Sequence, residues 1–491
     1  MLQPSVRARR RAWLVLAVLG AAAASAAAQT SHPTGKIAIT TASEAAKADF
    51  VRGRQLAENL RLEDSRQYFR SAIAKDPGFA MAHLSLANSS PTGTEFFEHL
   101  GHAVELADNA SPGERLAIQG AKAGANGDPA GQLALYQKLV ADYPGDERAH
   151  FLLGNAWFGR QDYEKAIAEY RRATDVAADF APAYNIVGYA YRTLGRYAEA
   201  EQAFKKYIQL IPDDPNPYDS YAELLMKMGR FDESIAQYRK ALEVNPQFSP
   251  SYTGIATNLT FQGKYDASRA EAQKLYRGAR SDGDKRAAMF ATTITYLDEG
   301  KTDLALAELE KQYTLGQSTN DAAAMAGDAT SMGNVLLATG RPAEALKRYE
   351  QALQVVKASD LSPEVKENAK QLHHYNAARV AIASGDLARA RSENETFMRQ
   401  AEARENPFQV RLGHEVAGTI ALAEKDWDGA LTHLDQANLQ DPYNLYRQGL
   451  AYEGKGDRAK AKEKLAGAVG FNQLPTINSA LVRMKARQQK A

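Results

Sequence analysis

One short stretch places histidine and glutamate at helical spacing, "EHLGHAVE" from Glu98 to Glu105. His99 and His102 are three residues apart, so on a helix both imidazoles would lie on one face with a glutamate to either side. Two imidazoles and a carboxylate form a ligand set that zinc accepts. The stretch is therefore a candidate metal site, and the alternative is a solvated helix face.

Other signatures of enzyme chemistry are missing from the sequence. It contains no cysteine nucleophile, no phosphate-binding loop and neither the G-x-G-x-x-G nor the G-x-S-x-G motif. His414-Glu415 lacks the second histidine that the zinc-protease motif H-E-x-x-H requires, and His373-His374 would point to two faces of one helix. We therefore expect no catalytic residue, no metal and no cofactor. A metal-dependent enzyme using His99 and His102 is the alternative.

A second set of candidate residues follows from a repeat in the sequence. Residues 153–173 read "LGNAWFGRQDYEKAIAEYRRA" and residues 187–207 read "VGYAYRTLGRYAEAEQAFKKY". Small, aromatic and alanine positions recur 34 residues apart, as in Gly154 and Gly188 or Tyr170 and Phe204. A fixed period of this length indicates stacked structural units that cannot bury their apolar faces alone.

Each unit is predicted to form two amphipathic helices, because apolar residues recur at three- and four-residue spacing on both sides of a short turn. The turn glycines Gly195, Gly229 and Gly263 lie where the first helix must end, since glycine accepts the left-handed conformation. Small residues such as Gly154 and Gly188 should let the paired helices approach closely, with aromatic residues filling the space beside them.

The sequence therefore predicts an all-α solenoid of about twelve antiparallel helix pairs. The repeats are uninterrupted over about residues 111–278 and looser afterwards, where we expect longer helices or loops. The predicted organisation is a signal peptide (1–28), a flexible linker (29–40), an N-terminal repeat array (41–282, most regular over 111–278), a degenerate C-terminal array (283–474) and a basic C-terminal helix or tail (475–491). For the last segment we expect a frayed tail.

The repeat resembles that of the tetratricopeptide repeat family, whose pattern is an apolar or aromatic residue, Leu-Gly, Tyr, Ala, Phe and Pro over 34 residues. Residues 181–214 carry it as Tyr184, Val187, Gly188, Tyr191, Ala200, Phe204 and Pro212. The resemblance implies a right-handed superhelix with first helices on the concave surface and second helices outside. It also implies a scaffold for protein partners.

First-helix residues between the framework positions should project into the concave groove. In phase, these are Phe151, Asn155, Phe158, Asn185, Tyr189, Arg192, Asp219 and Glu223. Aromatic and Arg side chains beside amides suit an extended peptide, whose backbone the amides can hydrogen-bond. The acidic pair should favour a basic residue in the partner. The alternative is that Phe151 and Phe158 pack against neighbouring units.

The family's peptide clamp, which grips a C-terminal carboxylate with Lys and Asn, is matched only in part. Asn155 occupies the Asn place, and Phe151 stands in the Lys place.

The first residues are predicted to form a secretory signal peptide. A basic head containing Arg9 to Arg11 precedes an apolar stretch from Trp13 that ends in the small-residue cleavage site Ala26-Ala27-Ala28. We expect cleavage after Ala28 and a periplasmic or secreted protein. The alternative is an uncleaved segment that anchors the protein in the inner membrane. After signal removal we expect no integral membrane span.

Charge and cysteine content limit the partners. The chain has 60 basic and 59 acidic residues, and residues 1–28 contain four Arg and no acid. This balance gives no general attraction to nucleic acid. Without cysteine there are no disulfides, so packing alone must stabilise an exported chain. The sequence thus favours an exported, non-catalytic scaffold that binds a protein or extended peptide in its groove. The alternative is an assembly or accessory subunit of an envelope machine for secretion, outer-membrane assembly or polysaccharide export.

Overall fold

The computed structural model describes residues 35–488. The predicted signal peptide, residues 29–34 of the predicted linker and residues 489–491 lie outside the described residues. Within residues 35–488 the chain forms 25 α-helices, one short 3-10 helix (Ala107–Asn109) and no strand. The predicted all-α solenoid is therefore confirmed.

The first fourteen helices are α1 (Glu44–Glu58), α2 (Leu62–Lys75), α3 (Ala80–Asn88), α4 (Gly93–Glu105), α5 (Pro112–Ala125), α6 (Pro129–Asp142), α7 (Glu147–Gly159), α8 (Tyr163–Val176), α9 (Ala181–Thr193), α10 (Tyr197–Leu210), α11 (Asn216–Lys227), α12 (Phe231–Val244), α13 (Ser249–Phe261) and α14 (Tyr265–Arg277). The remaining helices are α15 (Asp282–Glu299), α16 (Thr302–Ser318), α17 (Ala322–Ala338), α18 (Pro342–Ala358), α19 (Pro363–Ala383), α20 (Leu387–Ala403), α21 (Pro407–Glu424), α22 (Trp427–Leu434), α23 (Pro442–Gly454), α24 (Arg458–Val469) and α25 (Ile477–Gln488).

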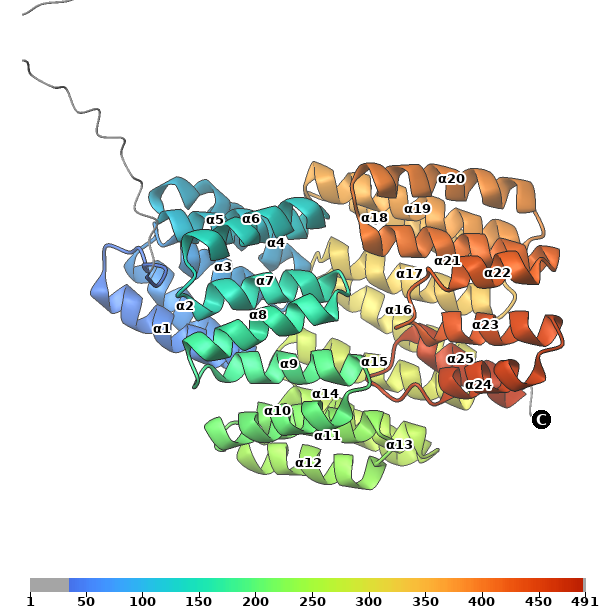
Figure 1. The fold of residues 1–491 in the computed structure, drawn as a ribbon, viewed down its shortest axis with the longest axis horizontal. Helices are drawn as coiled ribbons and strands as arrows, with labels where there is room; N and C mark the ends of the chain where they lie inside the picture. Colours follow the sequence, from blue (N-terminus) through green and yellow to red (C-terminus); the bar gives the residue numbers. More distant parts are fainter. Residues whose placement is uncertain (1–34, 489–491) are drawn as a thin grey trace, which may run out of the picture.

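Consecutive helices pack in antiparallel pairs, from α1 with α2 to α23 with α24 (Figure 1). The described chain therefore contains the twelve pairs that the sequence predicts. Helices α15 to α20 have 17 to 21 residues, whereas α7 to α10 have 13 or 14. The longer helices expected in the C-terminal half are thus present. Helices α14 and α15 pack together, so the array continues across residues 282 and 283.

The close contact between paired helices depends on the predicted small residues. A Cβ atom added at Gly154 would lie 2.4 Å from Cε1 of Tyr170, and one at Gly188 would lie 2.7 Å from Cε1 of Phe204. Both aromatic rings are completely buried. The turn residue Gly195 has φ of +74°, as the left-handed cap requires. The predicted roles of these glycines are confirmed.

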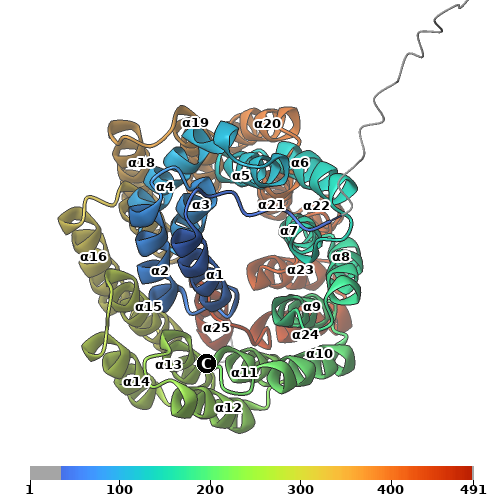
Figure 2. The same cartoon turned by 90° about the vertical axis from the view of Figure 1, so that its left-hand side faces the viewer.

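The pairs wind into a superhelix whose second turn stacks on the first. Figure 2 views it end on, with the C-terminal helices behind the N-terminal ones. Side chains more than 200 positions apart join the two turns. Nη1 of Arg280 lies 2.9 Å from Oδ1 of Asp64, and Nε2 of Gln161 donates to Oδ1 of Asn438 at 2.9 Å.

Helix α25 is not the frayed tail that we expected. It packs against α24, the helix that precedes it, and against α15, α17 and α23. The last three are first helices, so α25 lies on the concave side of the second turn. Its Leu481 and Met484 are buried in a core cluster with α15 and α17 residues. Nε of Arg483 donates to Oδ1 of the buried Asp298 at 2.7 Å. Arg483 and Lys485 therefore bond to groups of the protein: Arg483 to Asp298, and Lys485 to the Ala338 carbonyl.

The described part of the predicted flexible linker is also held in place. The segment of residues 36–42 runs extended past the N-terminal ends of α7 and α5 and the C-terminal end of α2, and side chains on these ends accept hydrogen bonds from its main chain. The prediction of a flexible linker does not hold for these residues. The segment lies outside the repeat and has no helical periodicity, so the sequence pattern did not indicate that it packs.

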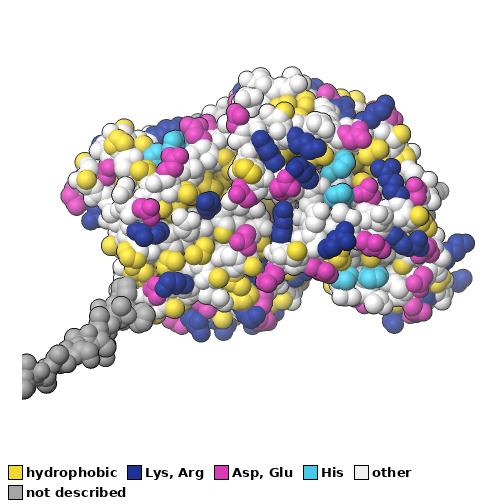
Figure 3. All heavy atoms as spheres, turned by 90° about the horizontal axis from the view of Figure 1, so that it is seen from above, with side chains coloured by type: hydrophobic (Ala, Val, Ile, Leu, Met, Phe, Trp, Pro, Cys, Tyr) yellow, Lys and Arg dark blue, Asp and Glu magenta, His cyan; other side chains and the backbone are white. Residues whose placement is uncertain are grey.

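The face seen in Figure 3 carries acidic and basic side chains interspersed, as expected for solvated outer helices. No helix within residues 35–488 is long and apolar enough to cross a membrane.

We predict that Gly188→Leu destabilises the array, because the added side chain must displace Phe204. Overpacking of this kind costs about 1–3 kcal/mol or more. Gly159→Leu is the matched control, since a Cβ atom there meets nothing within 4 Å. Urea unfolding followed by circular dichroism should show a loss for the first variant only. Equal unfolding midpoints for the two variants would mean that the helix contact is not close at Gly188.

Candidate functional site

The concave surface is lined by residues at fixed positions relative to the small residue of each first helix. The residue that follows the small residue is Asn155, Tyr189 and Glu223 in three consecutive units. In the C-terminal half the same position holds Asn334, after Gly333, and Arg379, after Ala378. Asn334 and Arg379 both line a hollow between first helices. The repeat register therefore identifies concave positions along the array.

Three of the predicted groove residues form one polar cluster between α9 and α11. The hydroxyl of Tyr189 donates to Oε1 of Glu223 at 3.0 Å, and Nη1 of Arg192 donates to Oε2 at 2.8 Å. The Arg192 guanidinium also lies over the Tyr189 ring, 4.6 Å from its centroid. The Arg192 and Glu223 side chains are only 14% and 10% exposed. The negative charge of Glu223 is thus neutralised within the protein.

Two other predicted groove residues are buried instead of projecting into the groove. Asn185 is 2% exposed and Asp219 is 5% exposed. Asp219 accepts a hydrogen bond from Oγ of Ser251 at 2.7 Å, in the next unit. The expectation failed here because neighbouring first helices pack against each other at this position. Asp219 and Glu223 are therefore not a free acidic pair for a basic partner residue.

Because Arg192 belongs to this polar cluster, substituting it is expected to affect the stability of the protein as well as binding. Removing one partner of a buried ion pair costs about 3–5 kcal/mol, because the other charge stays buried and uncompensated. Arg192→Ala should therefore weaken folding as well as any contact with a partner.

Burial raises the pKa of the Asp219 carboxyl well above its usual range, and the nearby charge of Glu223 acts in the same direction.

The remaining predicted residues lie on α7. Phe151 packs against Phe180, with ring centroids 5.5 Å apart, so the packing alternative holds for it. Asn155 is exposed, and its Oδ1 accepts a hydrogen bond from the Tyr170 hydroxyl at 2.9 Å. Phe158 is half-buried. Of the eight predicted residues, Asn155 is thus exposed, and three are buried, namely Asn185, Asp219 and Glu223. The other four are half-buried, namely Phe151, Phe158, Tyr189 and Arg192.

A first hollow lies on the concave side of α1, α3, α5 and α7, with a volume of about 490 Å³. Its wall is largely apolar and includes Phe50, Leu84, Ala117 and Phe151. Polar side chains also line it, among them an ion pair in which Nε and Nη2 of Arg148 donate to the two carboxylate oxygens of Glu58 at 2.7 and 3.1 Å.

The segment of residues 36–42 forms one side of the first hollow. Its Ile37 N–H donates to Oδ2 of Asp146 at 2.9 Å, and its Thr40 N–H donates to Oε1 of Glu114 at 3.0 Å. Ile37 and Ile39 are half-buried while the residues between and beside them are exposed. Gly113 leaves room for Ile37, because a Cβ atom there would lie 3.0 Å from it.

Sequence reasoning missed the first hollow, although a signal existed. Ile37 and Ile39 alternate with exposed residues, which is the pattern of a half-buried extended segment. The carboxylates that hold the segment are helix-start residues, since Glu114 completes a capping box and Asp146 is an N-cap. Such residues are expected to accept hydrogen bonds from their own helix, so a second role for them is not visible in the pattern.

The candidate metal site gains a third imidazole that the sequence did not indicate. The ring of His83 in α3 lies 5.8 Å from that of His99 and 5.3 Å from that of His102, centroid to centroid. Within residues 35–488, however, no group of three or more His, Asp or Glu side chains is arranged to hold a metal ion.

The helix pairs, their stacking and the lined concave surface define a helical repeat solenoid, a class that presents extended binding surfaces. Models of the tetratricopeptide repeat match residues 120–182, 161–215, 191–259 and 443–469. The chain therefore contains tetratricopeptide repeats, as the resemblance implied. This fold is typically a non-catalytic scaffold for protein–protein interaction.

Two solved structures show the similarity at low sequence identity. A tetratricopeptide repeat protein from Parabacteroides merdae is 17% identical, with 53% of this chain and 98% of that chain covered and a TM-score of 0.37. YrrB, described as a TPR protein with an unusual peptide-binding site, is 19% identical, with 36% and 89% covered and a TM-score of 0.25. Among curated proteins, none matches the chain.

We predict that Asp219→Asn stabilises the protein increasingly as pH rises from 4 to 7. Because the folded-state pKa of Asp219 is raised, the folded state binds more protons than the unfolded state above pH of about 4. The stability contributed by the protonated carboxyl is therefore lost as pH rises, and the amide removes this loss. Urea unfolding at several pH values measures it, with Asp213→Asn at an exposed aspartate as control. A variant that is less stable than wild type at pH 7 but not at pH 4 would contradict the prediction.

Proposed function

We propose that this protein is an exported, non-catalytic scaffold that binds an extended segment of a partner protein on its concave face. The observation that carries the proposal is the bound state of its own residues 36–42. This segment lies along one side of the first hollow and is held as a peptide ligand would be, through its main chain and through two apolar side chains.

Main-chain recognition supports binding of an extended chain. The bonds from Ile37 N–H to Asp146 and from Thr40 N–H to Glu114 use ionised acceptors, which make stronger hydrogen bonds than neutral ones. Oγ of Ser111 also donates to the Ala38 carbonyl at 3.1 Å. These hydrogen bonds involve only main-chain groups of the segment, so they require an extended backbone but do not depend on which side chains it carries.

Contacts with side chains would determine which partner sequences the groove prefers. Ile37 packs on the cluster that contains Tyr143 and Leu153, and Ile39 packs on the cluster that contains Phe50 and Phe79. A partner segment of the same kind would be extended, with branched apolar residues at alternate positions and a basic residue before the first of them. The last feature follows from the ion pair between Lys36 and Glu147.

The rest of the concave face extends the groove beyond this segment. Asn155 and Phe158 lie further along α7, where Asn155 is exposed and Phe158 is half-buried. Their amide and aromatic types suit backbone and apolar contacts with a longer peptide. Localisation outside the cytoplasm is proposed from the predicted signal peptide.

We expect the peptide GKIAITTA, which copies residues 35–42, to bind in trans to a chain that begins at Ser43. Tethered binding corresponds to effective concentrations of about millimolar, so the dissociation constant should be about 1 mM or lower. N-methylation at Ile37 or Thr40 should weaken binding about tenfold, because each loses a charge-assisted hydrogen bond of about 1.5–3 kcal/mol. Calorimetric titration measures these affinities.

N-methylation at Ala38 is the matched control, since its N–H makes no hydrogen bond to any group of residues 35–488. Circular dichroism of the truncated chain checks that α1 to α24 still fold. If the peptide does not bind the folded truncated chain, or if all three N-methylated peptides bind alike, the groove does not recognise an extended main chain and the proposal is wrong.

Export predicts a mature chain that begins at Gln29. Mass spectrometry of the N-terminal peptide from fractionated bacterial cells should detect Gln29 as the first residue in the soluble envelope fraction. Replacing Ala26 and Ala28 with bulky residues should block cleavage and leave precursor in the membrane fraction. Detection of wild-type protein with Met1 in the membrane fraction would instead support the uncleaved anchor.

A further inference from the structure

A second hollow lies on the concave side of the C-terminal half, with a volume of about 460 Å³. It is formed by α17, α19, α21 and α23 and by α25, which lies across the concave surface there. Much of its wall is aliphatic, from Leu337, Ile382, Leu422, Leu450 and Leu481. Neither the repeat pattern nor the proposed peptide groove accounts for this hollow.

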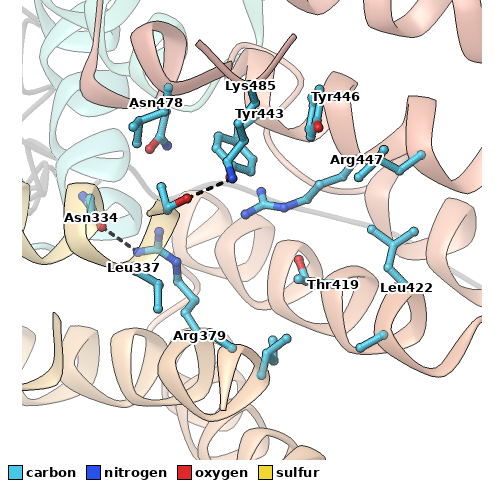
Figure 4. A pocket seen from close by; sticks show the side chains of 16 residues that line it. Asn334, Leu337, Arg379, Thr419, Leu422, Tyr443, Tyr446, Arg447, Asn478 and Lys485 are labelled. Atoms are coloured by element: carbon cyan, nitrogen blue, oxygen red, sulfur yellow. Dashed lines mark hydrogen bonds between the residues drawn. The ribbon is translucent and has the colours of Figure 1, made fainter. Parts of the chain in front are cut away.

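Three cationic side chains converge on the second hollow. Figure 4 shows Arg447 and Lys485 reaching into it from one side and Arg379 from the other. They come from three helices, α23, α25 and α19. Like charges held close together repel, so a fold that gathers them needs compensating negative charge.

The protein supplies only part of that compensation. Nη1 of Arg447 lies 3.2 Å from the buried carboxylate of Glu415. Arg379 has no carboxylate of residues 35–488 within ion-pair distance, and its Nη1 donates to the neutral amide oxygens of Asn334 and Asn376 at 2.8 and 3.3 Å. Nζ of Lys485 donates to the Ala338 carbonyl at 2.9 Å.

A second acidic residue, Asp441, lies close by and must be counted. Its Oδ2 accepts a hydrogen bond from Nδ2 of Asn478 at 2.6 Å. With Glu415 and Asp441 both ionised, three cations still face two anions. Burial and the charge of Glu415 raise the pKa of Asp441. With both carboxylates ionised, the site keeps a surplus of one positive charge.

The cationic groups are held ready by the surrounding side chains. The Arg379 guanidinium stacks over the Tyr375 ring at 5.1 Å, and that of Arg447 stacks over the Tyr443 ring at 4.4 Å. The Tyr375 hydroxyl donates to Glu415 at 2.9 Å, which joins the two stacks. Preorganised donors lose little entropy when an anion binds.

We propose that the second hollow binds a small amphiphilic monoanion, a carboxylate carried on an aliphatic chain, with the carboxylate between Arg379, Arg447 and Lys485 and the chain on the leucine-rich wall. A single surplus charge matches a monoanion, and a planar carboxylate matches guanidinium donors. The volume lies in the range of small-molecule sites, about 300–1,000 Å³. Helix α25 lies across the concave surface, so a long peptide cannot run through.

The test uses the full mature chain and decanoate, an aliphatic carboxylate, with decan-1-ol as the uncharged analogue of equal length. Calorimetric titration should show decanoate binding at least about tenfold more tightly than decan-1-ol, because only the carboxylate meets the cations. Decanoate should also raise the melting temperature, since it binds the folded state alone.

Variants separate the site from non-specific uptake. Arg379→Met should weaken decanoate binding about tenfold or more while the melting temperature without ligand stays equal or rises, because a surplus charge is removed. Leu422→Trp should block binding by filling the hollow. Arg389→Met, at an exposed arginine of the adjacent α20, should bind like wild type.

Three outcomes would overturn the inference. Decanoate and decan-1-ol could bind equally, or decanoate could fail to bind the folded chain. The third is that acetyl-Gly-Gly-Leu, a peptide with a free C-terminal carboxylate, binds more tightly than decanoate. Binding of GKIAITTA to the first hollow does not depend on these results, so the failure of this inference leaves the proposed function untouched.

Discussion

The fold depends on one contact that is repeated along the chain, the approach of a small first-helix residue to an aromatic ring of the second helix. At Gly154 and Gly188 the ring lies where a Cβ atom would have to be. This contact fixes the distance between paired helices, and a fixed pair presents a fixed face to the next pair. The rotation from pair to pair then accumulates into the superhelix. Everything on the concave surface inherits its position from this contact.

The concave surface is not uniform, although the units that build it are similar. In the N-terminal half its wall is apolar and bounded by an extended segment of the same chain. In the middle, Arg192 and Glu223 neutralise each other. In the C-terminal half Arg379 is matched with amides instead of a carboxylate. The concave surface thus carries three different local chemistries, because the residues around the small position can vary once the aromatic contact is formed.

The sequence was informative wherever a feature recurs with the period. It predicted the helix pairs, the close glycine contacts, the left-handed turn glycines and the longer C-terminal helices, because each leaves a repeated mark. It did not predict that Asn185 and Asp219 are buried, since their surroundings come from a neighbouring unit whose rotation the pattern does not specify. Helix α25 and residues 36–42 occur once, so no period indicated where they pack. The sequence also did not predict that His83 lies near His99, because this proximity arises from the packing of α3 on α4.

The contacts between superhelical turns have a mechanical consequence. A single-layer coil of helix pairs can change its pitch like a spring, because only neighbouring pairs touch. Here Arg280 with Asp64 and Gln161 with Asn438 tie one turn to the next across more than 200 residues. Extension along the axis must break these ties before the coil can lengthen. These ties therefore oppose a change in the curvature of the concave surface.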